Sequence, residues 1–275
     1  MRLDMHVHHR FPANESADTL LKNMNAAGID GGVIIAESPN GVLGSKNSNE
    51  QRLENVLKYT KGYETLFPFY WIDPTEEDAI KQVDMAVEAG IAGFKTICTH
   101  FYPYDERAVP VYHHIAETGK PYLFHSGILY DGTNPSGKYN RPCNFEVLLT
   151  IPKLRFALAH ISWPWCDESI AVFGKFNNFL ERGGAENAPE FFMDVTPGTP
   201  RLYRRDALMK FLDMDGALTH VTWGSDNSTQ GYRDGYAREI QRRDDAVFQE
   251  IGLGEDFLND IYYRNSMKFL TGKEY

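Results

Sequence analysis

Short apolar stretches alternate with longer amphipathic stretches along the whole chain. The apolar stretches predict strands at residues 2–8, 31–36, 65–72, 91–96, 121–125, 154–160, 190–195 and 219–224. Apolar positions at helical spacing predict helices at residues 17–27, 49–62, 76–89, 106–118, 144–150, 168–182, 204–212, 232–251 and 255–270. A helix thus follows each strand, which is typical of parallel strands joined by crossover connections.

Eight consecutive strand–helix units favour a closed (β/α)8 barrel, the TIM barrel. The 275 residues suit one such barrel of about 250 residues, and no linker rich in Pro, Gly or Ser divides the chain. We therefore expect a single α/β domain over residues 1–275 with an extra C-terminal helix. A doubly wound open sheet is the structural alternative, although it usually has fewer strands.

The composition of the chain argues against some classes of binding partner and indicates a cellular compartment. The 28 Lys and Arg residues against 38 Asp and Glu give a net charge of −10, which is unfavourable for binding nucleic acid. No apolar run is long enough for a membrane span, and no signal-peptide segment follows the first residues. Three cysteines without CxxC spacing fit a reducing compartment. We expect a cytoplasmic protein with a small-molecule substrate, and a homodimer is the commonest closed assembly.

Histidines gather at the end of the first predicted strand, in His6-Val7-His8. Residues two apart on a strand point to the same face, so both imidazoles have the same direction, with Asp4 on that face one step deeper. An HxH pair by itself is a weak signal, because it also fits an exposed terminal segment. Its meaning depends on what the other strand ends carry.

Three further polar residues follow later strands. His125 ends the fifth predicted strand, His160 ends the sixth and Asp226 follows the eighth. In a closed barrel the carboxyl ends of the strands meet at one mouth, where the active site lies. Imidazole and carboxylate groups are ligands for a divalent metal, and three or four of them with an open position make a catalytic site. The simpler alternative is two core histidines at strand ends.

The ordered set of these positions resembles the amidohydrolase superfamily, and more closely its amidohydrolase-related branch, which also holds non-oxidative decarboxylases. The matching positions are Asp4-x-His6-x-His8, His125, His160, Gly224-Ser225-Asp226 and the closing segment 261–270 with Asn265. The resemblance covers the whole chain. It implies a TIM barrel that holds one divalent ion, usually zinc, with manganese as the alternative.

The resemblance also implies a role for each matched residue. The implied metal ligands are His6, His8, His125 and Asp226. Asp226 also handles the proton of the metal's water, while His160 contacts water or substrate. These roles are chemically consistent, because zinc lowers the pKa of its water to about 7 and a nearby carboxylate can take the proton. A histidine opposite can stabilise developing negative charge.

Lys95 ends the fourth predicted strand, where two-metal amidohydrolases carry a carboxylated lysine that bridges the metals. In that interpretation His125 and His160 bind the second ion. We favour one metal, because the segment 90–95 (GIAGFK) fits the branch without carboxylation. Lys95 can also pair with a carboxylate in the barrel or hold a substrate carboxylate.

Other residues near the mouth are weaker candidates for contact with substrate. They are His100, Tyr102, Arg141 and Trp163, together with Tyr130 and Tyr139 of the long loop 126–143. For each of them a solvated loop position or a cap on the core is an equally good interpretation. His113 and His114 lie in the fourth predicted helix, where we expect a structural role. Arg204 and Arg205 are expected at the surface.

Two enzyme classes remain open. The first is a metal-dependent hydrolase of an ester, lactone or amide of a small carboxylic or aromatic compound, with Asp226 as base and then acid and His160 near the carbonyl oxygen. The second is a non-oxidative decarboxylase of a hydroxy-aromatic or enol carboxylate. A non-catalytic barrel would predict a broken metal position, and none is broken.

Overall fold

Strands and helices alternate as the sequence predicts in the computed structural model, which describes residues 1–39, 45–184 and 187–275. The strands are β1 (Leu3–His8), β2 (Gly31–Ile35), β3 (Leu66–Trp71), β4 (Gly93–Thr96), β5 (Tyr122–Phe124), β6 (Arg155–Leu158), β7 (Glu190–Asp194), β8 (Val221–Thr222) and β9 (Asn227–Ser228). The α-helices are α1 (Ala17–Ala26), α2 (Asn49–Thr60), α3 (Ala79–Glu88), α4 (Ala108–Glu117), α5 (Ser136–Tyr139), α6 (Cys166–Phe179), α7 (Arg201–Leu212), α8 (Asp234–Glu250), α9 (Glu255–Asn259) and α10 (Asn265–Thr271).

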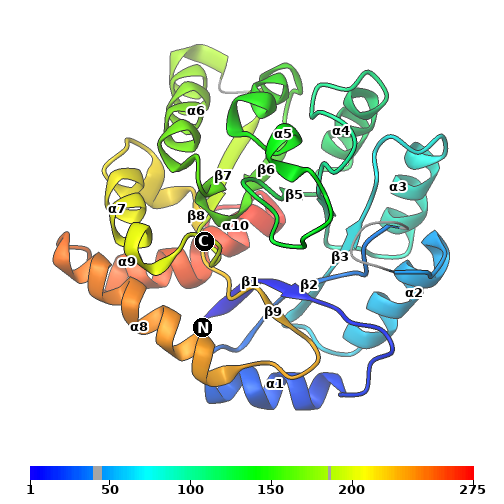
Figure 1. Cartoon of the computed structure of the whole chain (residues 1–275), viewed down its shortest axis with the longest axis horizontal. Helices are drawn as coiled ribbons and strands as arrows, with labels where there is room; N and C mark the ends of the chain where they lie inside the picture. Colours follow the sequence, from blue (N-terminus) through cyan, green and yellow to red (C-terminus); the bar gives the residue numbers. More distant parts are fainter. Residues whose placement is uncertain (40–44, 185–186) are drawn as a thin grey trace.

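The strands form one parallel sheet that curls into a barrel. Within the described residues its order is β8-β7-β6-β5-β4-β3-β2-β1-β9. The sheet closes because the chain after β8 turns and pairs β9 with β1, and because the Met5 amide donates to the Trp223 carbonyl at 3.0 Å. Figure 1 shows the strands at the centre with helices around them. The predicted α/β TIM-barrel architecture is confirmed.

Alternation along the strands divides the core into two layers. The inner layer contains Leu3, Met5, Val33, Ile35, Phe69, Trp71, Leu123, Ala157 and Phe192. A larger layer lies between the sheet and the helices around it. The predicted extra C-terminal helix ends in α10, whose Phe269 packs on Phe69 and Phe192 with ring centroids 6.4 and 5.3 Å away. Because Arg155 at the start of β6 donates to the Phe269 carbonyl, α10 covers the amino end of the barrel.

Two helix starts are explained by local sequence. Ser48 caps α2 through its side chain, and Gln51 completes a capping box, so two otherwise unpaired backbone amides are satisfied. Ser16 caps α1 by accepting from the Thr19 amide. The third helix begins at Ala79 rather than at the expected residue 76, and Asp78 before it makes no side-chain cap.

All eight predicted strands are shorter in the structure, and the differences are largest at β6 and β8. β6 ends at Leu158 rather than at residue 160, because the next residues form a 3-10 turn in which His160 has a left-handed φ of 66°. β8 is limited to Val221–Thr222, since Ala217–Thr219 before it is also a 3-10 turn. The expected helix at 144–150 is 3-10 as well.

Arg204 is buried on α7, which corrects the surface position expected for it. Its guanidinium makes two hydrogen bonds to Asp244 of α8, at 2.8 and 2.6 Å, and a third to the Val195 carbonyl. Trp223 donates its indole N–H to the same carboxylate. The Arg204–Asp244 pair therefore links α7 and α8 to the carboxyl ends of β7 and β8.

Replacing Arg204 by methionine is expected to lower the free energy of unfolding by about 3–5 kcal/mol, because Asp244 is left as a buried charge without its partner. Urea denaturation followed by circular dichroism measures this change. Arg205→Met is the matched control, since Arg205 pairs with Glu250 in solvent and such pairs contribute little. Equal unfolding midpoints for the two variants would contradict the assignment.

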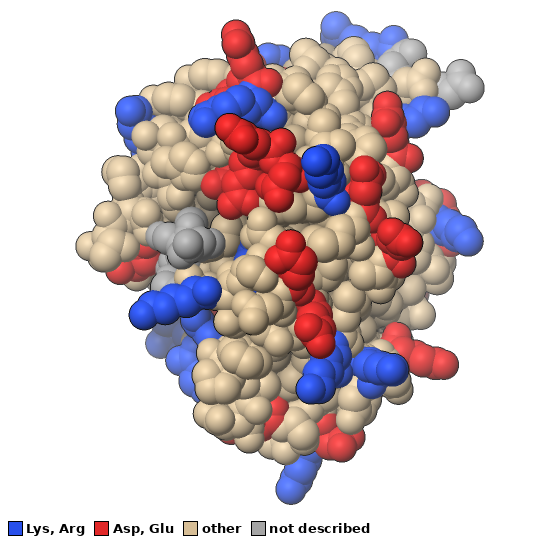
Figure 2. All heavy atoms as spheres, turned by 90° about the vertical axis from the view of Figure 1, so that its right-hand side faces the viewer, with Lys and Arg blue, Asp and Glu red and all other residues tan. Residues whose placement is uncertain are grey.

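The molecular surface carries both charge signs. On the face shown in Figure 2, Lys and Arg are scattered among Asp and Glu and form no continuous basic area. Among the helices that the structure describes, none is long and apolar enough to cross a membrane.

Candidate active site

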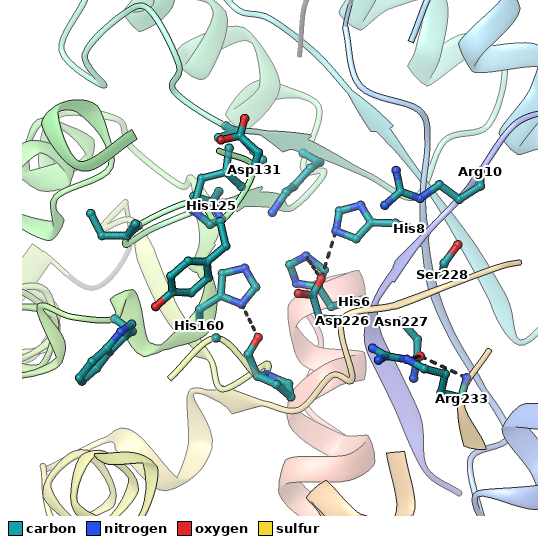
Figure 3. A pocket seen from close by; sticks show the side chains of 18 of the residues that line it. His6, His8, Arg10, His125, Asp131, His160, Asp226, Asn227, Ser228 and Arg233 are labelled. Atoms are coloured by element: carbon teal, nitrogen blue, oxygen red, sulfur yellow. Dashed lines mark hydrogen bonds and ion pairs between the residues drawn. The ribbon is translucent and has the colours of Figure 1, made fainter. Parts of the chain in front are cut away.

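A cavity of about 540 Å³ opens at the carboxyl ends of the strands. Eight residues singled out in the sequence line it: His6, His8, Lys95, His125, Tyr130, His160, Trp163 and Asp226. They lie on or after five different strands of the barrel, and Figure 3 shows His6, His8, His125, His160 and Asp226 converging. The closed barrel thus brings together residues up to 220 positions apart, from His6 to Asp226.

A bulge in β1 sets the direction of its two histidines. The pairing register between β1 and β2 shifts between Asp4 and Val7, which adds a residue to β1. Met5 packs in the inner layer of the core, while His6 and His8 line the cavity at the carboxyl end of the strand. The two imidazoles share a face, as predicted.

The bulge also corrects the position expected for Asp4. Its carboxylate does not join His6 and His8 but accepts hydrogen bonds from the Ser225 amide and the Tyr232 hydroxyl, both at 2.8 Å. Burial raises the pKa of Asp4 to about 6 in spite of these bonds. Asp4 therefore ties β1 to the turn that carries Asp226.

His6 is fully buried and oriented by a carboxylate. Its Nδ1 donates to Asp194 at 2.8 Å, which leaves Nε2 as the unprotonated ring nitrogen. Burial holds the pKa of His6 well below its ordinary value, so the ring is neutral at pH 7. Nε2 lies 3.9 Å from Asp226 Oδ1 and has no hydrogen-bond partner among the described residues.

His6, His8 and Asp226 form a group that could hold a metal ion, because one ligand atom from each lies within 4.8 Å of the others. The donor set fits a divalent ion, since two imidazoles and a carboxylate are preferred ligands of zinc. The buried, unpartnered Nε2 atoms of His6 and His125 support the fit. His125 follows β5 directly, and burial lowers the pKa of its imidazole well below the usual value. Its place as a further ligand remains a prediction.

Asp226 lies in a tight turn after β8, with a left-handed φ of 55°. Gly224 permits this turn, since a Cβ there would lie 2.8 Å from the Cβ of His6. Burial alone would raise the pKa of Asp226, but the hydrogen bond from His8 at 3.2 Å and the neighbouring imidazoles outweigh it and hold the pKa well below its usual range. The carboxylate is ionised at neutral pH.

His160 also lies in a left-handed turn, which aims its ring between the other histidines. Its ring centroid is 5.2 Å from that of His6 and 5.0 Å from that of His125. Nδ1 lies 3.1 Å from the Pro197 carbonyl and donates to it, so Nε2 is the acceptor nitrogen. Burial lowers the pKa of His160. The neutral His160 ring in this tautomer can accept a hydrogen bond or a proton at Nε2. It can donate a proton from Nε2 only after the ring has been protonated.

Lys95 is 1% exposed and lines the cavity from the end of β4. Its amine makes no hydrogen bond or ion pair within the described part of the chain. Burial lowers the pKa of Lys95 to about 8, although Asp194 and Asp226 act in the opposite direction. The lysine is thus a cation held next to the candidate metal ligands.

Four weaker candidates lie away from the cavity lining, including Tyr139, whose ring packs edge-on against Tyr102 at 5.0 Å. His100 is half-exposed and pairs with Asp73 at 3.3 Å. Tyr102 stacks on Tyr104 on the rim beside α4. Arg141 pairs with Glu168 at 2.8 Å in solvent. Trp163 and Tyr130, by contrast, do line the cavity.

Sequence reasoning missed three residues of the site: Asp194, Arg10 and Arg233. Asp194 carries a usable signal, because it ends the seventh strand at the same edge of the barrel as His125. Arg10 and Arg233 carry none, since both lie in loops, Arg10 after β1 and Arg233 just before α8, and only the folded chain places them beside the cavity.

Asp194→Asn is expected to weaken zinc binding by about 10- to 100-fold, because the amide no longer fixes the tautomer and charge of His6. Competition with a chromophoric chelator measures the affinity. Glu190→Gln is the matched control, since Glu190 lies at the other end of β7 and bonds to His220. Unchanged zinc affinity in Asp194→Asn would show that Asp194 has no part in metal binding.

Comparison with known proteins connects this site to a family. A family model described as Amidohydrolase matches residues 3–271. No curated protein matches the sequence.

Solved structures share the fold at low identity. A probable 2-pyrone-4,6-dicarboxylic acid hydrolase from Acinetobacter baumannii with citric acid bound is 14% identical over 99% of each chain, with a TM-score of 0.62. A 2,6-dihydroxybenzoate decarboxylase is 13% identical over 98% of each chain, with a TM-score of 0.66. A 5-carboxyvanillate decarboxylase from Novosphingobium aromaticivorans with bound manganese is 12% identical over 98% of this chain and 97% of that one, with a TM-score of 0.66.

Proposed function

Because the chain belongs to the amidohydrolase family, we propose that it is a metal-dependent hydrolase of an ester, lactone or amide of a small organic molecule. One observation carries the proposal: the ionised carboxylate of Asp226 faces two imidazoles, one of which has a buried ring nitrogen with no hydrogen-bond partner among the described residues. This arrangement suits a divalent ion with a water molecule beside it.

His6, His8 and Asp226 would hold the ion, with His125 as the fourth ligand. Zinc is the expected ion, and manganese is the alternative. When bound, the ion would lower the pKa of a water molecule to about 7 and polarise a carbonyl group. Asp194 accepts a hydrogen bond from the Nδ1–H group of His6, which keeps His6 in the tautomer that can bind the ion through Nε2.

The residues of the site can move the proton that hydrolysis requires. Asp226 is ionised and can take a proton from the attacking water, then return it to the leaving group. His160 offers an acceptor nitrogen on the same side of the cavity and orients the water. Lys95, which stays close to Asp226, stabilises negative charge on the carbonyl oxygen.

The bases of the cavity favour a hydrolase, because Asp226 and the acceptor nitrogen of His160 can take a proton from water. A decarboxylase must deliver a proton to carbon, and Lys95 is the protonated group of the cavity that could supply it. The aromatic walls, Trp163 and Tyr130, keep a decarboxylase of a hydroxy-aromatic acid as the second candidate.

A screen with two readouts tests the proposal. Zinc- and manganese-loaded protein is offered aryl esters, lactones and N-acyl amides with acid release as the signal, and hydroxybenzoates with CO2 release as the signal. We expect acid release that disappears after chelation and returns with the ion. CO2 release without ester, lactone or amide hydrolysis would assign the decarboxylase instead, and turnover that survives complete metal removal would overturn both.

A further inference from the structure

Two arginines line the cavity without a carboxylate partner in the part of the chain that the structure describes. Arg10 follows β1, and its guanidinium makes no hydrogen bond or ion pair within the described ranges. Arg233 precedes α8, and among the described residues its guanidinium contacts the Asn227 side chain at 3.4 Å and the ring of Tyr236. Neither contact neutralises its charge.

Several other arginines of this acidic chain have carboxylate partners, whereas the exposed Arg182 and Arg201 have none within the described residues. Arg141 pairs with Glu168, Arg205 with Glu250 and Arg264 with Asp260. With a net charge of −10, carboxylates are plentiful on this protein. Arg10 and Arg233 are exposed as well, but they are the two arginines in the lining of this cavity, so their guanidinium groups are placed to meet an anion that enters it.

The backbones of both arginines are anchored to the segment that closes the barrel. The Arg10 amide donates to Thr229 Oγ1 at 3.2 Å, and the Arg233 amide donates to Asn227 Oδ1 at 3.2 Å. In Figure 3 the two side chains reach toward the cavity from the side of His8 and Asp226. A group bound there would lie next to the candidate metal ligands.

The charge of the cavity supports an anionic ligand. Lys95 adds a third cation, buried and without a partner among the described residues. Of the two carboxylates in the lining, Asp226 belongs to the candidate metal group. The other, Asp131, accepts hydrogen bonds from Thr133 and Asn134 and lies across the cavity from Arg10 in Figure 3.

We propose that Arg10 and Arg233 form a carboxylate-binding subsite, so that the substrate is an organic acid bearing a carboxylate apart from the group that reacts. The inference rests on the proposed hydrolase function and narrows its substrate class. A guanidinium presents paired N–H donors that match the two oxygens of a carboxylate, and it stays charged at all working pH values. The arginines are specificity-determining residues, whereas the reacting carbonyl lies at His6, His8 and Asp226.

Matched pairs of ligands test the subsite by calorimetry on zinc-loaded protein. The probes are 3-carbamoylbenzoate against isophthalamide, and glutaramate against glutaramide, because each pair differs by one carboxylate replaced by an amide. We expect the wild-type protein to bind at least one of the two carboxylates about tenfold more tightly than its diamide partner. Arg10→Gln with Arg233→Gln should remove this preference and leave the bound zinc unchanged. Arg205→Gln serves as the surface control.

The outcomes separate the subsite from the hydrolase function. A lack of preference in both pairs, or a preference that survives the double substitution, would overturn the subsite. The same titrations on metal-stripped protein isolate the arginines from the ion. If the protein neither retains metal nor hydrolyses any ester, lactone or amide, yet shows the arginine-dependent preference, the proposed function falls and the anion site stands.

Discussion

Replacing Asp226 by asparagine is expected to lower kcat/KM about a thousandfold. General-base catalysis by a positioned side chain typically contributes a factor between about 10² and 10⁴. The amide keeps the shape of the carboxylate but can neither accept a proton from water nor carry the charge that His8 and His160 now stabilise. The measurement is steady-state turnover of whichever substrate the screen identifies.

The expected loss is specific to the carboxylate at this position. Asp167→Asn is the matched control, because Asp167 is exposed on α6 and pairs only with Lys210. Circular dichroism should show that both variants remain folded. Full activity in Asp226→Asn would refute the assignment of the base, and with it the proton path through this residue.

The second large effect concerns the metal itself. Protein purified without chelator is expected to carry about one divalent ion per chain, and His8→Ala should lose almost all of it, because three ligands from separate strands cannot replace a missing fourth. Elemental mass spectrometry measures the content. His8 is the suitable position, since its side chain is 18% exposed and its partner, the Asp226 side chain, is 38% exposed to solvent.

His113→Ala is the control for loss of a histidine. His113 lies on α4, on the outside of the barrel, as the sequence predicts. This variant should keep its metal and its turnover. A large loss of either would show that α4 contributes to the site.

The metal count also decides the state of Lys95. About two ions per chain, with loss after bicarbonate depletion, would indicate a carboxylated Lys95 and a binuclear hydrolase in which His125 and His160 bind the second ion. No ion, even after zinc or manganese is added back, would show that the candidate ligands do not bind metal, and the proposed function would fail with them.

The convergence of the candidate ligands was predictable because it follows from periodicity alone. Alternating strands and helices indicate a closed parallel barrel, and in such a barrel every strand ends at the same mouth. A polar residue at a strand end, such as His125, therefore has a known destination before any contact is known. This is why His6 and Asp226 could be placed together although they are far apart in sequence.

Details that depend on a single residue of register were not predictable. The bulge in β1 puts the Asp4 side chain on a different face from the His6 ring, because one extra residue exchanges the two faces of a strand. No local pattern marks the bulge, since the residues on either side of it are all compatible with a strand. The left-handed turn at His160 is equally invisible, because a histidine gives no warning of a positive φ.

By itself the sequence determined the fold class, the barrel edge at which the chemistry occurs and the residue types available there. These depend on patterns repeated over many residues, which no single contact can reverse. Only the tertiary structure decided which residues touch: that Asp194 orients His6, that Arg204 is buried against Asp244, and that Arg10 and Arg233 share a cavity. Such pairings join distant segments, and their geometry exists only once the barrel has closed.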